Sequence, residues 1–128
     1  MKILLDTHAF IWWAENNPIL STRARQAIAD RTNEVYVSAV VAWEIAIKAT
    51  LGKIVIFGSV ADLVNEQVLL NDFKELPVLL AHTFRLQLLP LLHKDPFDRL
   101  LIAQADAEGL AIVTRDPQFP QYGVNLLW

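Results

Sequence analysis

Four acidic residues stand where a carboxylate is hard to explain as ordinary protein surface: Asp6, Glu44, Asp98 and Asp116. Asp6 directly follows an apolar run, and Asp116 follows another after one intervening residue. Glu44 and Asp98 share helical rows with apolar side chains, which are expected to face inward. Carboxylates gathered in one place repel each other unless cations neutralise them. Hard oxygen ligands select Mg²⁺ or Mn²⁺, so the pattern indicates metal-dependent chemistry on a phosphate ester.

Each of these acids also has a purely structural interpretation. Asp6 and Asp116 could each cap the turn that follows a strand. Glu44 could form an ordinary ion pair with Lys48, an arrangement that stabilises a helix by roughly 0.2 to 0.5 kcal/mol. Asp98 could complete a capping box behind an aspartate N-cap, although such boxes prefer Glu or Gln at that position. The joint pattern favours a shared site, because these separate interpretations do not explain why four acids recur at comparable places.

The elements that must position the acids alternate along the chain. Apolar and β-branched runs predict strands over 2–5, 35–38, 76–78, 111–114 and 124–126. Helical periodicity and capping residues predict helices over 8–14, 23–31, 39–51, 61–70, 81–88 and from 95–96 to about 108. Strands alternating with helices imply a parallel sheet covered on both faces. Ligands bind such sheets at the carboxyl ends of the strands, where these acids would lie.

Composition fits one globular domain spanning residues 1–128, since 54% of the residues are hydrophobic and 20% are charged. Cysteine is absent, which excludes disulfides and zinc fingers and suits a reducing cytoplasm. No signal peptide is apparent, and no uncharged apolar run approaches the roughly 18 to 20 residues of a membrane span. We therefore expect a soluble, cytoplasmic protein. The net charge of −3 argues only weakly against nucleic-acid binding, because acids that face a cation would not repel phosphates.

Four motifs in this order resemble those of the PIN-domain nucleases, specifically the VapC-type toxins of bacterial and archaeal toxin–antitoxin pairs. The resemblance spans essentially the whole chain. Its carriers are the segments 4–8, 43–48, 93–99 and 114–116, together with Ser38. Any one motif alone would be weak, whereas four in order at suitable spacing are specific.

The resemblance implies a three-layer α/β/α sandwich with a five-stranded parallel sheet. It makes Asp6, Glu44, Asp98 and Asp116 the catalytic and metal-binding quartet for Mg²⁺ or Mn²⁺. Thr114 and Ser38 would be auxiliary residues, and the basic residues Lys48, Arg99 and Arg115 could hold flanking phosphates. Val41 stands where related sequences often carry a second Ser or Thr, which puts only an auxiliary hydrogen bond in doubt.

The implied function is hydrolysis of RNA phosphodiester bonds in tRNA, rRNA or mRNA, leaving a 5′-phosphate and a 3′-hydroxyl. The implied partners are a VapB-like antitoxin and a second copy of the chain, with no membrane. The aromatic residues Phe10, Trp12, Trp13 and Trp43 add modest support, because tryptophan is enriched at interfaces, although all four could equally be core.

Other functions stay open on the sequence alone. The chain could be a PIN-fold protein of RNA processing without toxicity, or a non-catalytic module whose aromatic groove binds a partner helix. Zinc ligation by His8, His82 and His93 lacks His-x-His or His-x-x-x-His spacing. A phosphatase or receiver-like domain using Asp6 as phosphate acceptor lacks the additional acid that such sites carry near the first strand.

Overall fold

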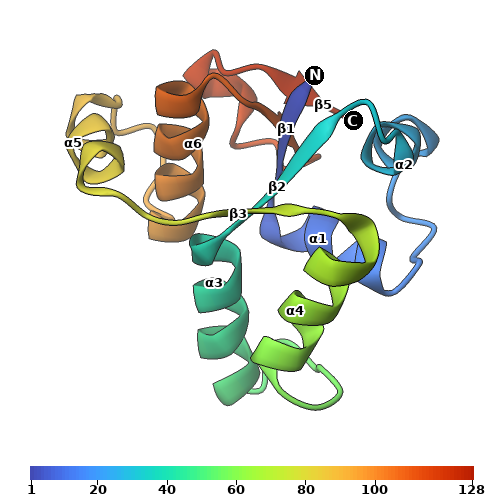
Figure 1. Cartoon of the computed structure of the whole chain (residues 1–128). Coiled ribbons are helices and arrows are strands. Elements are labelled where there is room, and N and C mark those ends of the chain that lie inside the picture. The colour runs from blue at the N-terminus through green and yellow to red at the C-terminus, as the bar shows by residue number, and fades with distance from the viewer.

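A computed structural model describes residues 1–128, and its strands and helices alternate as the sequence predicts (Figure 1). The strands are β1 (Lys2–Leu5), β2 (Glu34–Ser38), β3 (Lys74–Leu76), β4 (Ala111–Val113) and β5 (Leu126–Leu127). The helices are α1 (Thr7–Ala14), α2 (Thr22–Ala29), α3 (Ala39–Thr50), α4 (Val60–Asn71), α5 (Leu80–Leu88) and α6 (Pro96–Glu108), and a 3₁₀ turn, η1, covers Pro120–Tyr122.

All five strands form one parallel sheet in the order β3-β2-β1-β4-β5. The central strand β1 is buried on both faces, and Ile3, Leu4 and Leu5 are each 0% exposed. In Figure 1, α5 and α6 lie on one side of the strands and α1 and α2 on the other. The expected five-stranded α/β/α arrangement is therefore confirmed.

Polar caps set where the helices begin. The side chains of Asp6, Ser21, Ser38 and Asp95 each accept a hydrogen bond from a backbone N–H in the first turn of α1, α2, α3 and α6 respectively. Such acceptors satisfy N–H groups that have no partner inside the helix. Gly109 ends α6 in the left-handed conformation, at φ +68°. These local signals explain why the predicted helices match the observed ones to within one or two residues.

Two edge strands lie away from their predicted positions. The prediction of 76–78 for the third strand was wrong: β3 runs from Lys74 to Leu76, because Pro77 has no N–H to donate to a sheet ladder. The last strand is Leu126–Leu127 rather than 124–126. Gly123, at φ +68°, ends the preceding 3₁₀ turn, and the backbone reaches β4 only from Asn125 onward.

The four aromatic residues considered as interface candidates differ in their exposure. Phe10 is fully buried, Trp12 and Trp13 pack partly buried against the core, and Trp43 is 49% exposed. Trp43 therefore remains a candidate contact residue, whereas Phe10 belongs to the core. None of the helices combines the length and the apolar character that crossing a membrane requires.

Candidate metal centre

The four acids come from four different elements that meet at the carboxyl edge of the sheet. Asp6 follows β1 directly, and Asp116 lies just beyond β4, the strand paired with β1. Glu44 and Asp98 lie in the first halves of α3 and α6. Figure 1 shows α1, α3 and α6 all beginning on the side toward which β1 and β2 point. A parallel sheet produces this arrangement because every strand ends, and every following helix starts, at the same edge.

Asp6 caps a helix, and burial makes the charged form of its carboxylate costly. Its Oδ1 accepts a hydrogen bond of 2.7 Å from the backbone N–H of Ala9, so it caps α1 as the structural interpretation expected. The side chain is nevertheless buried, and burial raises the pKa of Asp6 to about 6. Hydrogen bonds from Thr114 and Ala9 lower this pKa in part, whereas the charges of Asp116 and Glu44 raise it further.

Asp98 is perturbed in the same way. Burial raises the pKa of Asp98 to about 6, against the lowering effect of a hydrogen bond from His93, and the charges of Asp95, Asp116 and Glu44 raise it further. The capping of α6 falls to Asp95, whose Oδ1 accepts from the N–H groups of Phe97 and Asp98. The Asp98 carboxylate instead meets His93, with 3.1 Å between Nε2 and Oδ2, so it does not complete a capping box.

Glu44 is buried and both of its carboxylate oxygens are engaged. The hydroxyl of Thr7 donates to Oε1 at 2.6 Å, and the Lys48 ammonium pairs with Oε2. Burial lowers the pKa of Lys48, but the hydrogen bond and charge of Glu44 outweigh it and the net direction is upward. The ion pair expected from the spacing is therefore present, inside the site. Sequence reasoning assigned no site role to Thr7, although Thr7 belongs to the 4–8 motif and directly follows Asp6.

Asp116 and Thr114 organise the turn after β4. The backbone N–H of Asp116 donates to the Thr114 hydroxyl at 3.0 Å, and the N–H of Gln118 donates to Oδ1 of Asp116 at 2.9 Å. Thr114 is buried and close enough to Asp6 to lower its pKa. Both residues thus shape the turn and face the acidic edge.

The remaining predicted residues separate into two groups. Arg115 is exposed, and its guanidinium lies 4.9 Å from the centre of the Trp12 ring. It lines a cavity of about 290 Å³ together with Asp6, His8, Trp12, Asp116 and Pro117. Ser38 contacts none of the four acids: its hydroxyl donates to Gln104 and accepts from the backbone N–H of Val40. Arg99 donates to the backbone oxygen of Pro90 and to the Tyr122 hydroxyl, so its guanidinium is engaged in hydrogen bonds within the protein.

The carboxylate oxygens of the four acids suit a hard divalent cation. Their side chains do not lie close enough to one another to surround one. No group of three or more His, Asp or Glu side chains is placed to hold a metal ion as they stand. Each acid instead binds its own N–H or O–H donors, which is the arrangement that mutual repulsion favours. Oxygen ligands from four elements and two acids with raised pKa values match the chemistry that binds Mg²⁺ or Mn²⁺.

Fold and site together define a parallel α/β protein with an acidic binding edge. The PIN domain model matches residues 3–125, so the chain belongs to the PIN domain family. No curated protein matches it in sequence.

Solved structures share the fold over nearly the whole chain. A chain of VapBC2 from Rickettsia felis bound to a promoter DNA fragment is similar at TM-score 0.73 and 18% identity, over 98% of this chain and 97% of that one. DNA-bound VapBC from Salmonella typhimurium follows at 0.72 and 16%, over 98% and 96%. FitAcB from Neisseria gonorrhoeae gives 0.64 and 21%, over 97% and 95%.

Replacing Asp6 by Asn should stabilise the metal-free protein. The folded state holds the Asp6 proton more tightly than the unfolded chain, so wild-type stability falls as pH rises from about 4 to 6. In EDTA above that range, Asp6→Asn should raise the free energy of unfolding by about 1 to 3 kcal/mol, and near pH 4 by little. Asparagine keeps the cap on α1.

Urea denaturation at several pH values measures this difference. Asp62→Asn, at an exposed acid in the first turn of α4, is the control and should be neutral or slightly destabilising. A loss of stability in Asp6→Asn above pH 6 would contradict the view that the buried charge is costly.

Proposed function

We propose that this protein is a Mg²⁺- or Mn²⁺-dependent endoribonuclease. The observation that carries the proposal is a pair of carboxylates at one sheet edge: Asp6 is buried, and the Asp98 side chain is only 16% exposed. Burial raises the pKa of each to about 6, and both sense the charges of Asp116 and Glu44. A protein keeps such costly charges where a ligand uses them, and the family membership makes a nuclease site the natural use.

Asp6, Asp98 and Asp116 would hold the cation, with Glu44 as a further ligand or as the group that positions the attacking water. When bound, a divalent cation supplies activation of water and stabilisation of the leaving oxygen. Water adds to phosphorus and the 3′ oxygen leaves, so the products carry a 5′-phosphate and a 3′-hydroxyl. Thr7 and Lys48 hold both oxygens of Glu44, so they would fix its orientation toward that water.

Arg115 is the basic residue best placed to meet a flanking phosphate. It is exposed, lines the cavity beside Asp6 and Asp116, and is held over the Trp12 ring. Lys48 is paired with Glu44 and Arg99 with Tyr122, so neither is as free to bind substrate. A guanidinium contacts phosphate oxygens without reading base sequence. This contact would therefore set affinity for RNA rather than the choice among tRNA, rRNA and mRNA.

We further propose that the protein is the toxin of a toxin–antitoxin pair, acting in the cytoplasm, paired with a second copy and inhibited by a VapB-like antitoxin. Its fold is that of chains in VapBC complexes. Apolar side chains are exposed on α3 at Trp43 and Ile47, directly after α3 at Leu51, and on α5 at Leu80, Phe84 and Leu88. Exposed apolar faces of this kind mark protein–protein contacts. A role in RNA processing without toxicity, or as a pure binding module, is the alternative.

Replacing Asp98 by Asn should slow cleavage of a structured RNA panel by about 100-fold or more, because a lost ligand removes several kcal/mol of metal-derived stabilisation. EDTA should abolish cleavage by the wild type, and Mn²⁺ should restore it. Asp62→Asn, the same change in the first turn of α4, should cut at the wild-type rate. Equal cleavage rates for Asp98→Asn and the wild type would exclude this mechanism. No cleavage by the wild type in Mn²⁺ would favour the binding-module alternative.

Replacing Arg115 by Gln should raise KM for RNA several-fold and weaken the salt dependence of KM, with a smaller effect on kcat, because one phosphate contact is lost. Steady-state kinetics at two salt concentrations measure both effects. Arg23→Gln on α2, also exposed, is the matched control and should change neither. An unchanged KM in Arg115→Gln would show that Arg115 does not contact a phosphate of the RNA substrate.

Induced expression of the wild type in a bacterial host should arrest growth, whereas Asp98→Asn should not, because the proposed toxicity depends on cleavage. Growth curves with equal protein levels, verified by immunoblot, measure this. Arrest by both proteins would point to toxicity through binding, and arrest by neither would favour a role in RNA processing.

A further inference from the structure

A chain of hydrogen bonds leads from the C-terminal segment to one of the four acids. The Tyr122 hydroxyl, on η1, is 2.6 Å from Nδ1 of His93, and Nε2 of the same ring is 3.1 Å from Oδ2 of Asp98. The backbone N–H of His93 and the guanidinium of Arg99 also reach the Tyr122 oxygen, at 3.3 and 3.0 Å. His93 and Asp98 are both largely shielded from solvent.

This network determines which nitrogen of His93 carries the proton. A tyrosine oxygen accepts up to two hydrogen bonds and donates one. The N–H groups of His93 and Arg99 use both acceptor positions of Tyr122, so its own O–H is left to donate to Nδ1. An N–H on Nδ1 would make the same oxygen accept a third bond. His93 is therefore held with its N–H on Nε2, facing the Asp98 carboxylate.

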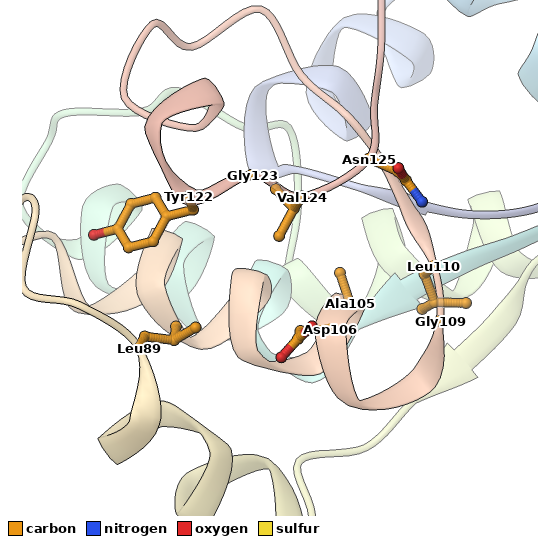
Figure 2. Close-up of a pocket in the computed structure, with 9 residues that line it drawn as sticks. All are labelled: Leu89, Ala105, Asp106, Gly109, Leu110, Tyr122, Gly123, Val124 and Asn125. Atoms are coloured by element: carbon orange, nitrogen blue, oxygen red, sulfur yellow. The ribbon is translucent and has the colours of Figure 1, made fainter.

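The Tyr122 ring packs partly buried against the core and meets the His93 ring edge to face, with 5.4 Å between ring centres, so the hydroxyl adds direction to contacts that the ring already makes. Figure 2 shows the ring at one end of a cavity of about 210 Å³, with its oxygen directed away from Val124 and Asn125. A side chain that lines empty space gains little contact on that face. Removing the oxygen would leave these ring contacts in place but would remove the hydrogen bond to Nδ1 that fixes the proton position on His93.

We propose that Tyr122 and His93 are positioning residues that orient the Asp98 carboxylate for the cation. The Nε2–H of His93 occupies Oδ2 of Asp98 and leaves Oδ1 available to the metal. The proposal rests on the proposed function, because it assumes that Asp98 is a ligand. Groups that orient a ligand in this way are typically worth 10- to 100-fold in metal affinity, so about 10-fold is expected for one hydroxyl.

The first test reads the His93 tautomer in metal-free protein. Imidazole ¹⁵N shifts at about pH 8, where an ordinary histidine is neutral, should show one N–H form for His93 in the wild type. Tyr122→Phe should shift it toward a mixture, whereas Tyr36→Phe, at the other tyrosine, should not. His82 is an internal reference, because its Nδ1 accepts from Leu79 and its Nε2 faces Glu108. An unchanged His93 tautomer in Tyr122→Phe would overturn the proposal.

The second test titrates Mn²⁺ by calorimetry. Tyr122→Phe should weaken binding about 10-fold relative to Tyr36→Phe. His93→Ala should weaken it at least as much, and His93→Gln should restore part of the loss, because its amide can donate to Asp98. Wild-type affinity in Tyr122→Phe, or no rescue by Gln, would also overturn the proposal. If the wild type bound no Mn²⁺, the proposed function would fail, while the tautomer measurement would still decide the role of Tyr122.

Discussion

The burial of a carboxylate at the end of the central strand is the constraint on which the rest of this protein depends. β1 is flanked by β2 and β4 and covered on both faces, so Asp6 leaves the sheet at its most enclosed point. The N-terminus of α1 and the Thr114 hydroxyl offset part of the cost of its charge. The remainder appears as a pKa raised to about 6, and a bound cation would remove it.

The other acids are held by donors from their own segments and, for Glu44, also from the start of α1. Thr7 and Lys48 engage Glu44, and His93 engages Asp98. No three of the acids or histidines come together as a ligand set, and these donors engage the carboxylates separately. They also divide the roles: Glu44 is paired with a cationic side chain, whereas Asp6 and Asp98 are not. Under the proposed function, Asp6 and Asp98 would be direct ligands and Glu44 the group that positions water.

Much of the fold could be predicted because its signals are local. Capping by Asp6, Ser38 and Asp95 set three helix starts, and the alternation of elements implied a parallel sheet. The edge strands were less predictable. β3 ends before Pro77, and β5 begins only where the chain returns to β4, so their bounds depend on pairing rather than on composition. Ser38 likewise caps its helix as expected, but its second partner, Gln104, lies on α6.

The sequence by itself determined which acidic residues lie among apolar ones. It also implied that they share one edge, because parallel strands all end at the same edge of the sheet. The spacing also predicted the pair of Glu44 with Lys48, but it could not determine the contacts between groups that are remote in sequence. Thr7 meets Glu44 across 37 positions, and Tyr122 meets His93 across 29. Only tertiary packing brings such groups within hydrogen-bonding distance. The local pattern thus identified the candidate site, and the fold decided which hydrogen bonds each of its members makes.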